Sequence, residues 1–196
     1  MIEMTLEGAD TLIADLANVP TATTRGLLRA LNRGISAAQT VMTREIGRDM
    51  GLKAGDVRDR LRLRNATLGT LEAMLGASLK QIPLIKFDAR GSEPSRGKGR
   101  GVSYKIGQGG RSRFEQAFIA TMGGQHRGVF VRKASLARRS AGAWSKNLPI
   151  KELFGPSVGH VFGKYRSLGL KRAEDAFMTT FAHEEIFRAA ANAGTH

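Results

Sequence analysis

Residues 21–50 read TATTRGLLRALNRGISAAQTVMTREIGRDM, and this segment sets the architecture expected for the chain. Its apolar residues recur at spacings of three and four, which places them on one stripe of a helix. Pro20 bars helix immediately upstream, and Gly51 stands where the residue after a helix end would. Internal glycines weaken such a helix by roughly 1 kcal/mol each against alanine, so we expect it to depend on packing. The stripe consists of Leu28, Leu31, Ile35, Ala38, Met42 and Ile46.

After this helix the sequence predicts a second, short helix and then a series of strands. The segment AGDVRDRLRLR, residues 54–64, has an apolar face and an i,i+4 pair of Asp56 with Arg60, which favour a helix. The apolar segments that follow are short, which is typical of strands. The glycines of MGGQHRG, residues 122–128, favour a hairpin turn. The strands are expected at residues 71–79, 82–87, 102–106, 117–122 and 128–134.

The end of the chain is predicted to be helical again, over residues 171–192. The segment LPIKELFGPSVGHVF, residues 148–162, is apolar but interrupted by proline and glycine, which is typical of an ordered connection. The segment ARGSEPSRGKGRG, residues 89–101, lacks apolar side chains that could anchor it, so we expect a flexible, basic, glycine-rich loop. The chain, residues 1–196, is therefore expected to form a single α+β domain: a long N-terminal helix, a small antiparallel sheet with the flexible basic loop, and a C-terminal helix.

Charge is distributed very unevenly along the chain, whose formal net charge is +14. Residues 1–20 form an acidic N-terminal segment with four acids and no base. Residues 94–114 hold six bases and no acid, and residues 116–151 hold seven bases and no acid. Such a charge repels itself and favours a compensating partner, which can be nucleic acid, an anionic membrane or an acidic protein surface.

The basic centre is the candidate binding site, for DNA phosphate or for an acidic protein neighbour. A solvated surface is the alternative, and we favour the binding interpretation because acids are missing over so long a stretch. Direct base reading is not indicated, because the sequence contains no recognition-helix or zinc-finger pattern. Three aromatic residues are interleaved with the bases: Tyr104, Phe114 and Trp144. They could stack on nucleic-acid bases, or they could anchor the protein's core or an interface. The candidate contact residues are Arg96, Lys98, Arg100, Lys105, Arg111, Arg113, Arg127, Arg132, Lys133, Arg138, Arg139 and Lys146.

Catalysis, metal binding and cofactor binding are not expected. The chain has no cysteine, which excludes thiolate chemistry and disulfides, and its glycine-rich stretches at residues 97–101 and 107–110 do not match a nucleotide-binding fingerprint. The four histidines form no metal-binding pattern, there is no Gly-x-Ser-x-Gly elbow, and nothing places Glu115 and Glu152 together. We expect neither a signal peptide nor a membrane span, since the N-terminus is acidic and no apolar run reaches about 20 residues.

Four segments in order resemble the phage minor tail protein Z family. They are TREIGRDMGLKAGDVRDRLRLRNAT (43–67), IPLIKFDAR (82–90) followed by the basic loop, AFIATMGGQHRGVFVRKAS (117–135), and LPIKELFGPSVGHVF (148–162). Together the resemblance extends over about residues 20–190, and the acidic N-terminal segment has no counterpart in it.

The resemblance implies a structural virion protein that completes the tail at its head-proximal end, near the path of the DNA. It implies a homo-oligomeric ring, commonly of six subunits, with the tail terminator, the tail tube and the tape measure end as neighbours. The protein would be made in the host cytoplasm and end in the virion tail, with non-specific contact to phage DNA and none to a membrane. No catalytic residues follow from it. The alternative is a non-enzymatic, basic nucleic-acid-binding module. A third possibility, a basic enzyme that acts on nucleic acid, would need an acidic metal-binding cluster that the sequence lacks.

Overall fold

The computed structural model describes residues 21–91, 93, 101–132 and 150–193. The described residues group into two compact units. The helical unit takes the described residues among Met1–Ile46, Ala54–Leu79 and Val158–His196, and the sheet unit takes those among Gly47–Lys53 and Lys80–Ser157.

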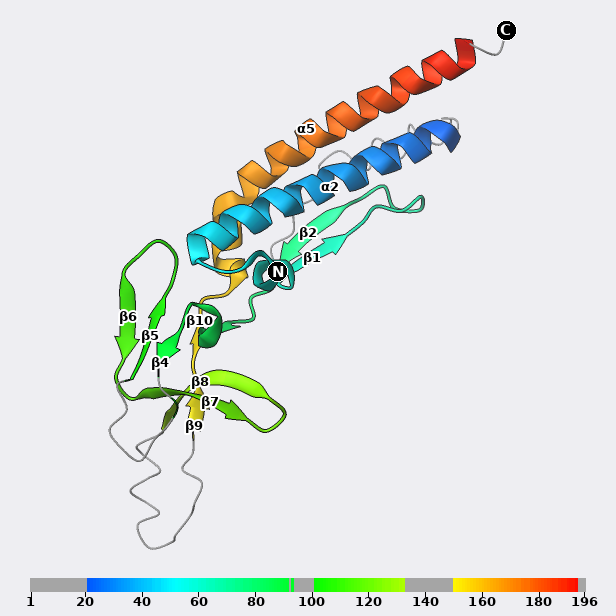
Figure 1. Ribbon diagram of the computed structural model, residues 1–196. Coiled ribbons are helices and arrows are strands. Elements are labelled where there is room, and N and C mark those ends of the chain that lie inside the picture. The colour runs from blue at the N-terminus through cyan, green and yellow to red at the C-terminus, as the bar shows by residue number, and fades with distance from the viewer. Residues whose placement is uncertain (1–20, 92, 94–100, 133–149, 194–196) are drawn as a thin grey trace, which may run out of the picture. The chain divides into compact units, whose positions relative to one another are not determined.

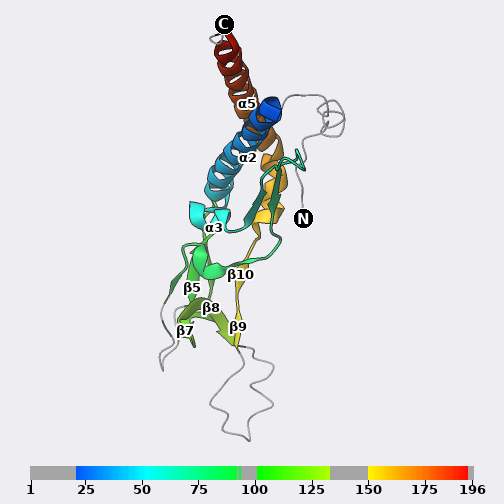
Figure 2. The ribbon, with the colours of Figure 1, turned by 90° about the vertical axis from the view of Figure 1, so that its right-hand side faces the viewer.

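Two long helices form the body of the helical unit. They are α2 (Thr21–Met50), whose last turn is grouped with the sheet unit, and α5 (Val158–Ala193). Figures 1 and 2 both show them side by side, and they run antiparallel, so that the start of α2 lies next to the end of α5. A two-stranded hairpin of β1 (Leu61–Arg64) and β2 (Met74–Ala77) packs against them. The Asn32 side chain of α2 bonds both the N–H and the carbonyl of Ala66 in this hairpin.

The apolar stripe predicted for α2 forms the core of this unit. Five of its six members are buried, and Leu28, near the start of the helix, is half-buried. Leu75 of β2 and Phe162 of α5 are completely buried in the same unit. Burial of each large apolar side chain stabilises the fold by roughly 1.5–3 kcal/mol, so packing supplies the stability that glycines remove from α2.

The predicted short helix over residues 54–64 is wrong in its second half. The helix α3 covers only Ala54–Arg58, and Leu61–Arg64 is the strand β1, paired in register with β2 from Leu61 opposite Ala77 to Arg64 opposite Met74. The physical reason is the period of the sequence Leu-Arg-Leu-Arg, which alternates every two residues and therefore fits a half-buried strand better than a helix.

The C-terminal helix is longer than predicted. It begins at Val158 rather than at residue 171, so the last part of the expected connection, residues 158–162, is helical. Val158 and Phe162 are four residues apart and both fully buried, which places them on one helical face that the interspersed glycines obscured in the sequence. The rest of the connection contributes two short strands, β9 (Ile150–Glu152) and β10 (Phe154–Gly155).

The sheet unit holds three small antiparallel sheets. The strand order is β4-β5-β6 in one and β7-β8-β9 in another, and β10 pairs with β3 in the third. Buried residues of this unit include Phe87, Val102, Ile119 and Val129. The remaining strands are β3 (Ile82–Pro83), β4 (Arg90–Gly91), β5 (Val102–Lys105), β6 (Arg111–Phe114), β7 (Ala117–Met122) and β8 (His126–Arg132).

Several strand predictions are confirmed and others are corrected. The hairpin of β7 and β8 is as expected, with its turn at residues 123–125 and Gly124 at a φ of 82°. The predicted strand over residues 82–87 ends at Pro83, because Leu84–Lys86 form the 3-10 helix η1. The start of the predicted loop at residues 89–101 includes β4; most of that loop, residue 92 and residues 94–100, lies outside the described residues, and its flexibility stays a prediction.

The end of α2 is fixed within the sheet unit by a pair of backbone contacts. Gly51 follows the helix with a φ of 69°, as predicted, and the Leu52 N–H donates to the Gly47 carbonyl at 2.9 Å, which closes the last turn. The N–H of Gly107, in the turn between β5 and β6, donates to the Met50 carbonyl at 2.9 Å. This turn therefore satisfies a carbonyl that the end of a helix leaves without a partner.

The α+β class is confirmed, with one long helix near each end of the described chain and antiparallel strands between them. These strands are divided among four small sheets, where the sequence indicated one. None of the helices in the described part of the chain is long and apolar enough to cross a bilayer.

Candidate functional site

The hairpin of β5 and β6 separates basic from aromatic side chains. Lys105 lies opposite Arg111, and Ser103 lies opposite Arg113, so these three bases share one face of the hairpin. Tyr104 and Phe114 project from the other face, where their rings stack with centroids 5.2 Å apart. All four side chains of β6 are exposed, and β6 is an edge of its sheet. The hairpin thus presents two chemically different faces.

One of the predicted contact residues, Arg111, has a structural role. Its guanidinium bonds both the carboxylate and the main-chain carbonyl of Asp88, and Arg90 lies 3.2 Å from the same carboxylate. Hydrogen bonds from Arg111 and then from Arg90 hold the pKa of the Asp88 carboxyl below its ordinary value. Asp88 has a φ of 44°, a conformation that aspartate tolerates better than most residues. Arg111 therefore ties β6 to the turn before β4.

The two described bases of β8 lie on opposite faces of their sheet. Arg127 is paired with Thr121 in register and is exposed. Arg132 is five residues further on, so it projects from the other face, where its guanidinium carbon lies 5.5 Å from the centre of the Phe118 ring. Such a cation–π contact is worth about 0.5–1 kcal/mol at an exposed site. The β7-β8-β9 sheet consequently offers basic charge in two directions.

A histidine–carboxylate pair lies on the face of the same sheet from which Arg132 projects. Nε2 of His126 is 3.0 Å from an oxygen of Glu152, and the His126 ring meets the edge of Phe130. The exposed histidine is thus a described partner of Glu152. Across the described ranges no three histidine or acidic side chains gather into a group that could hold a metal ion. The pair links the side chains of β8 and β9.

The structure brings together only part of the predicted basic site. Lys105, Arg111 and Arg113 share a face, whereas Arg127 and Arg132 diverge. Trp144 and the remaining candidates lie outside the described residues, so their arrangement stays a prediction. Those candidates are Arg96, Lys98, Arg100, Lys133, Arg138, Arg139 and Lys146.

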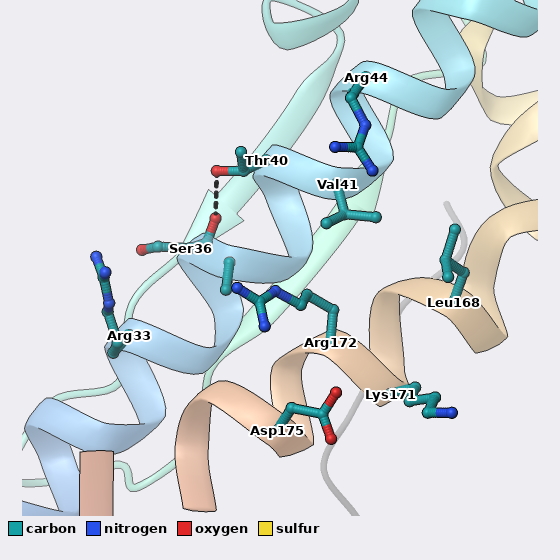
Figure 3. A pocket seen from close by; sticks show the side chains of 10 residues that line it. Arg33, Ser36, Thr40, Val41, Arg44, Leu168, Lys171, Arg172 and Asp175 are labelled. Carbon is teal, nitrogen blue, oxygen red and sulfur yellow. Dashed lines mark hydrogen bonds between the residues drawn. The ribbon is translucent and has the colours of Figure 1, made fainter. Parts of the chain in front are cut away.

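A second basic feature lies in the helical unit and was missed in the sequence. It is an open groove of about 660 Å³ between α2 and α5, shown in Figure 3. Ala37, Val41 and Leu168 give it an apolar floor, and Leu168 is 42% exposed. We call it the interhelix groove. Its polar lining is Arg33, Ser36, Thr40, Arg44, Lys171, Arg172 and Asp175.

The sequence does carry a signal for this groove. Arg33, Thr40 and Arg44 are spaced by seven and four residues, so they follow one line along α2 beside the buried stripe. On α5, Lys171, Arg172 and Asp175 occupy one turn. The sequence alone does not relate these two sets of bases, because they lie on helices more than 100 residues apart.

Exposed arginine and aromatic side chains on edge strands are typical of proteins that bind other macromolecules. Comparison with known families identifies the one to which this chain is similar: the model of prophage minor tail protein Z matches residues 6–183 of the 196. The chain belongs to this family of bacteriophage minor tail proteins. Its setting is accordingly the phage tail and its neighbours are other tail components. No curated protein and no solved structure matches the chain significantly.

The family match confirms the resemblance seen in the sequence and extends it at one end. The resemblance began at about residue 20, whereas the match begins at residue 6. The family match therefore includes most of the acidic N-terminal segment, which the resemblance did not cover.

Proposed function

We propose that this minor tail protein is a structural, non-enzymatic subunit that completes the head-proximal end of the tail. In this proposal it forms a homo-oligomeric ring, commonly of six copies, beside the tail terminator, the tail tube and the tape measure end. The family match over residues 6–183 supports a tail protein, and the position and ring follow from what the resemblance implies.

The observation that carries the proposal is the two-faced β5–β6 hairpin. Subunits in a ring need surfaces that are buried only on assembly, and arginine and aromatic residues are enriched in such surfaces. Phe114 is 43% exposed and Ile106 is 37% exposed, while Arg113 lies on the opposite face. Charge on an edge strand also prevents unwanted pairing with other sheets, so β6 would accept only a complementary neighbour.

The positive charge supports a location near the DNA. A ring through which DNA passes benefits from a basic lining, because phosphate contacts give affinity without sequence preference. The net charge of +14 and the exposed Arg127 and Arg113 are consistent with such a lining. A free nucleic-acid-binding module has the same charge but would act as a separate soluble protein, and this difference can be measured.

Location in the particle tests the proposal directly. The chain has no native cysteine, so Lys53→Cys introduces a single exposed thiol that a maleimide-linked gold cluster can label. In labelled, complete virions we expect density for the label in one ring at the head–tail junction. Label along the tail shaft, at the distal tip, or absent from purified tails would overturn the proposed position.

A mass measurement tests the ring. The subunit mass is 21.2 kDa. Native mass spectrometry of the protein released from tails should therefore give a whole-number multiple of this mass, about six times the subunit mass for the proposed ring. A monomer that is retained by DNA and never recovered with tails would favour the nucleic-acid-binding module instead.

A further inference from the structure

We propose that the interhelix groove is the docking site for the acidic N-terminal segment of this same protein, residues 1–20, supplied by the same copy or by a neighbouring copy. The inference concerns the helical unit alone and does not depend on the ring or on its position in the tail.

The groove carries positive charge that the described residues do not neutralise. Arg33, Lys171 and Arg172 form no ion pair with a carboxylate in the described part of the chain. Arg44 is paired with its neighbour Glu45 at 2.9 Å, and Asp175 is the one acid in the lining. Figure 3 shows the guanidinium of Arg172 directed across the groove toward α2. An anionic occupant would therefore have favourable electrostatic interactions with several cations at once.

The acidic segment has the complementary chemistry. It contains Glu3, Glu7, Asp10 and Asp15 and no base. Apolar residues stand between these acids, among them Leu6 and Leu12. The groove combines a basic rim with the apolar floor of Ala37, Val41 and Leu168, so both kinds of side chain would find a matching surface.

Chain length permits the segment to reach the groove. Arg33 lies 12 residues after Thr21 and Arg44 lies 23 residues after it, or roughly 18 and 35 Å along a helix at about 1.5 Å per residue. Asp10 is separated from Thr21 by 11 residues, which in extended form span about 36 Å at about 3.3 Å each. Glu3, Glu7 and Asp10 are therefore all within reach of the whole groove, even from the same copy.

An acidic peptide suits this groove better than duplex DNA does. Duplex DNA presents only phosphates to such a surface, whereas the lining of this groove combines bases with apolar side chains and one acid. The apolar floor would remain unmatched by phosphate, and Asp175 would repel it. DNA binding in the groove is nevertheless a distinct result of the experiment below.

The test uses cysteine cross-linking in the full chain, which has no native cysteine to interfere. One cysteine replaces Asp10 and a second replaces Thr40, an exposed residue of the groove. A short bismaleimide is added, and the products are identified by mass spectrometry. We expect a yield at least about tenfold above that of the reference pair Asp10→Cys with Leu68→Cys, since Leu68 is exposed in the same unit but does not line the groove. Intrachain and interchain products both support the proposal and distinguish the same copy from a neighbouring one.

Charge variants provide the matched control. Arg33→Glu with Arg172→Glu should reduce the yield of the Asp10–Thr40 product about tenfold or more. Arg25→Glu with Arg166→Glu makes the same change in net charge on the same helices outside the groove, and should leave the yield unchanged. Circular dichroism verifies that each variant keeps its helices.

Two results would overturn the inference. One is equal cross-linking at Thr40 and Leu68, or a yield that the groove variant does not lower. The other concerns duplex DNA that binds the protein through Arg33 and Arg172. If its affinity is the same with and without residues 2–20, the groove is a phosphate site and the acidic segment is not its occupant.

Discussion

Gly34 of α2 lies directly against the carbonyl oxygen of Ala173 in α5. A methyl group added at Gly34 would lie 2.8 Å from that oxygen and 3.5 Å from Cβ of Phe177. The two helices of the helical unit therefore meet backbone to backbone at this point, and a glycine that lowers helix propensity is required for their close packing.

The first prediction follows from this contact. Gly34→Ala should destabilise the protein by about 1–3 kcal/mol, because the helices must move apart, although alanine favours helix. Gly163→Ala, in α5 and with open space around the added methyl group, should stabilise it by about 0.5–1 kcal/mol. Chemical denaturation of both variants checks this pair, and equal effects would contradict the packing described for Gly34.

The contact between the end of α2 and the β5–β6 turn gives a second prediction. Gly107 has a φ of 65°, and an added methyl group would overlap the Asp49 carbonyl oxygen. Gly107→Ala should therefore cost about 2–4 kcal/mol in the free energy of unfolding, from left-handed strain and overlap together. Gly109→Ala, two residues away in the same turn, has only ordinary contacts and should cost within about 0.5 kcal/mol.

The Asp88 cluster predicts a pH dependence. Because Arg111 and Arg90 lower the pKa of Asp88 in the folded state, the ionised carboxylate contributes stability that is complete above its ordinary pKa of 3.8. That contribution is lost as the pH falls through the lowered folded value. Asp88→Asn removes the charge and keeps a residue that tolerates positive φ. The wild-type protein should be more stable than Asp88→Asn at neutral pH, and the gap should shrink below pH 3.8; a constant gap would contradict the ion pair.

Salt dependence of DNA retention is the fourth prediction. If exposed bases of the sheet unit contact phosphate, the slope of log affinity against log salt should fall by about 0.9 for each contact removed. Arg113→Ala with Arg127→Ala should therefore reduce the slope by about 1–2 in fluorescence anisotropy with duplex DNA. Arg62→Ala with Arg64→Ala, exposed bases of β1, provides the control. Equal slopes for the two variants would argue that these bases face protein instead.

The long helix α2 was predictable because it repeats a strong physical signal over many residues, whereas α5 was predicted only from residue 171, since glycines obscure the apolar face of its first turns. The stripe from Leu31 to Ile46 keeps its helical spacing for four turns, and burial of that stripe in the structure follows directly. The hairpin of β7 and β8 was equally visible, because two apolar segments flank a turn rich in glycine.

Other elements carried too little signal. The strand β6 reads Arg-Ser-Arg-Phe with every side chain exposed, so it shows no alternation of apolar and polar residues. The short strands β9 and β10 are defined by partners distant in sequence, such as Phe130 opposite Glu152 and Ile82 opposite Gly155. Local patterns cannot reveal pairings of this kind.

The candidate site was predicted in composition more than in geometry. Sequence identified Lys105, Arg111 and Arg113 as bases, but the pairing of β5 with β6 was needed to place them on one face and the Tyr104–Phe114 stack on the other. The role of Arg111 in holding Asp88 depends on residues 23 apart in the chain. The interhelix groove requires two helices more than 100 residues apart, which no local pattern relates.

Incorporation of a charge-reversed subunit into tails is the measurement that bears most directly on the structural role proposed here. Arg113→Glu with Arg127→Glu changes two exposed bases of the sheet unit, and Arg62→Glu with Arg64→Glu makes the same charge change on β1. Each folded variant is supplied in trans to a phage that lacks the native gene, and the protein content of purified particles and the infectious titre are measured. The account predicts that the first variant is absent from tails and that the titre falls at least about a hundredfold, while the control is incorporated normally. Normal incorporation and titre for the first variant, or normal particles without any copy of the protein, would contradict it.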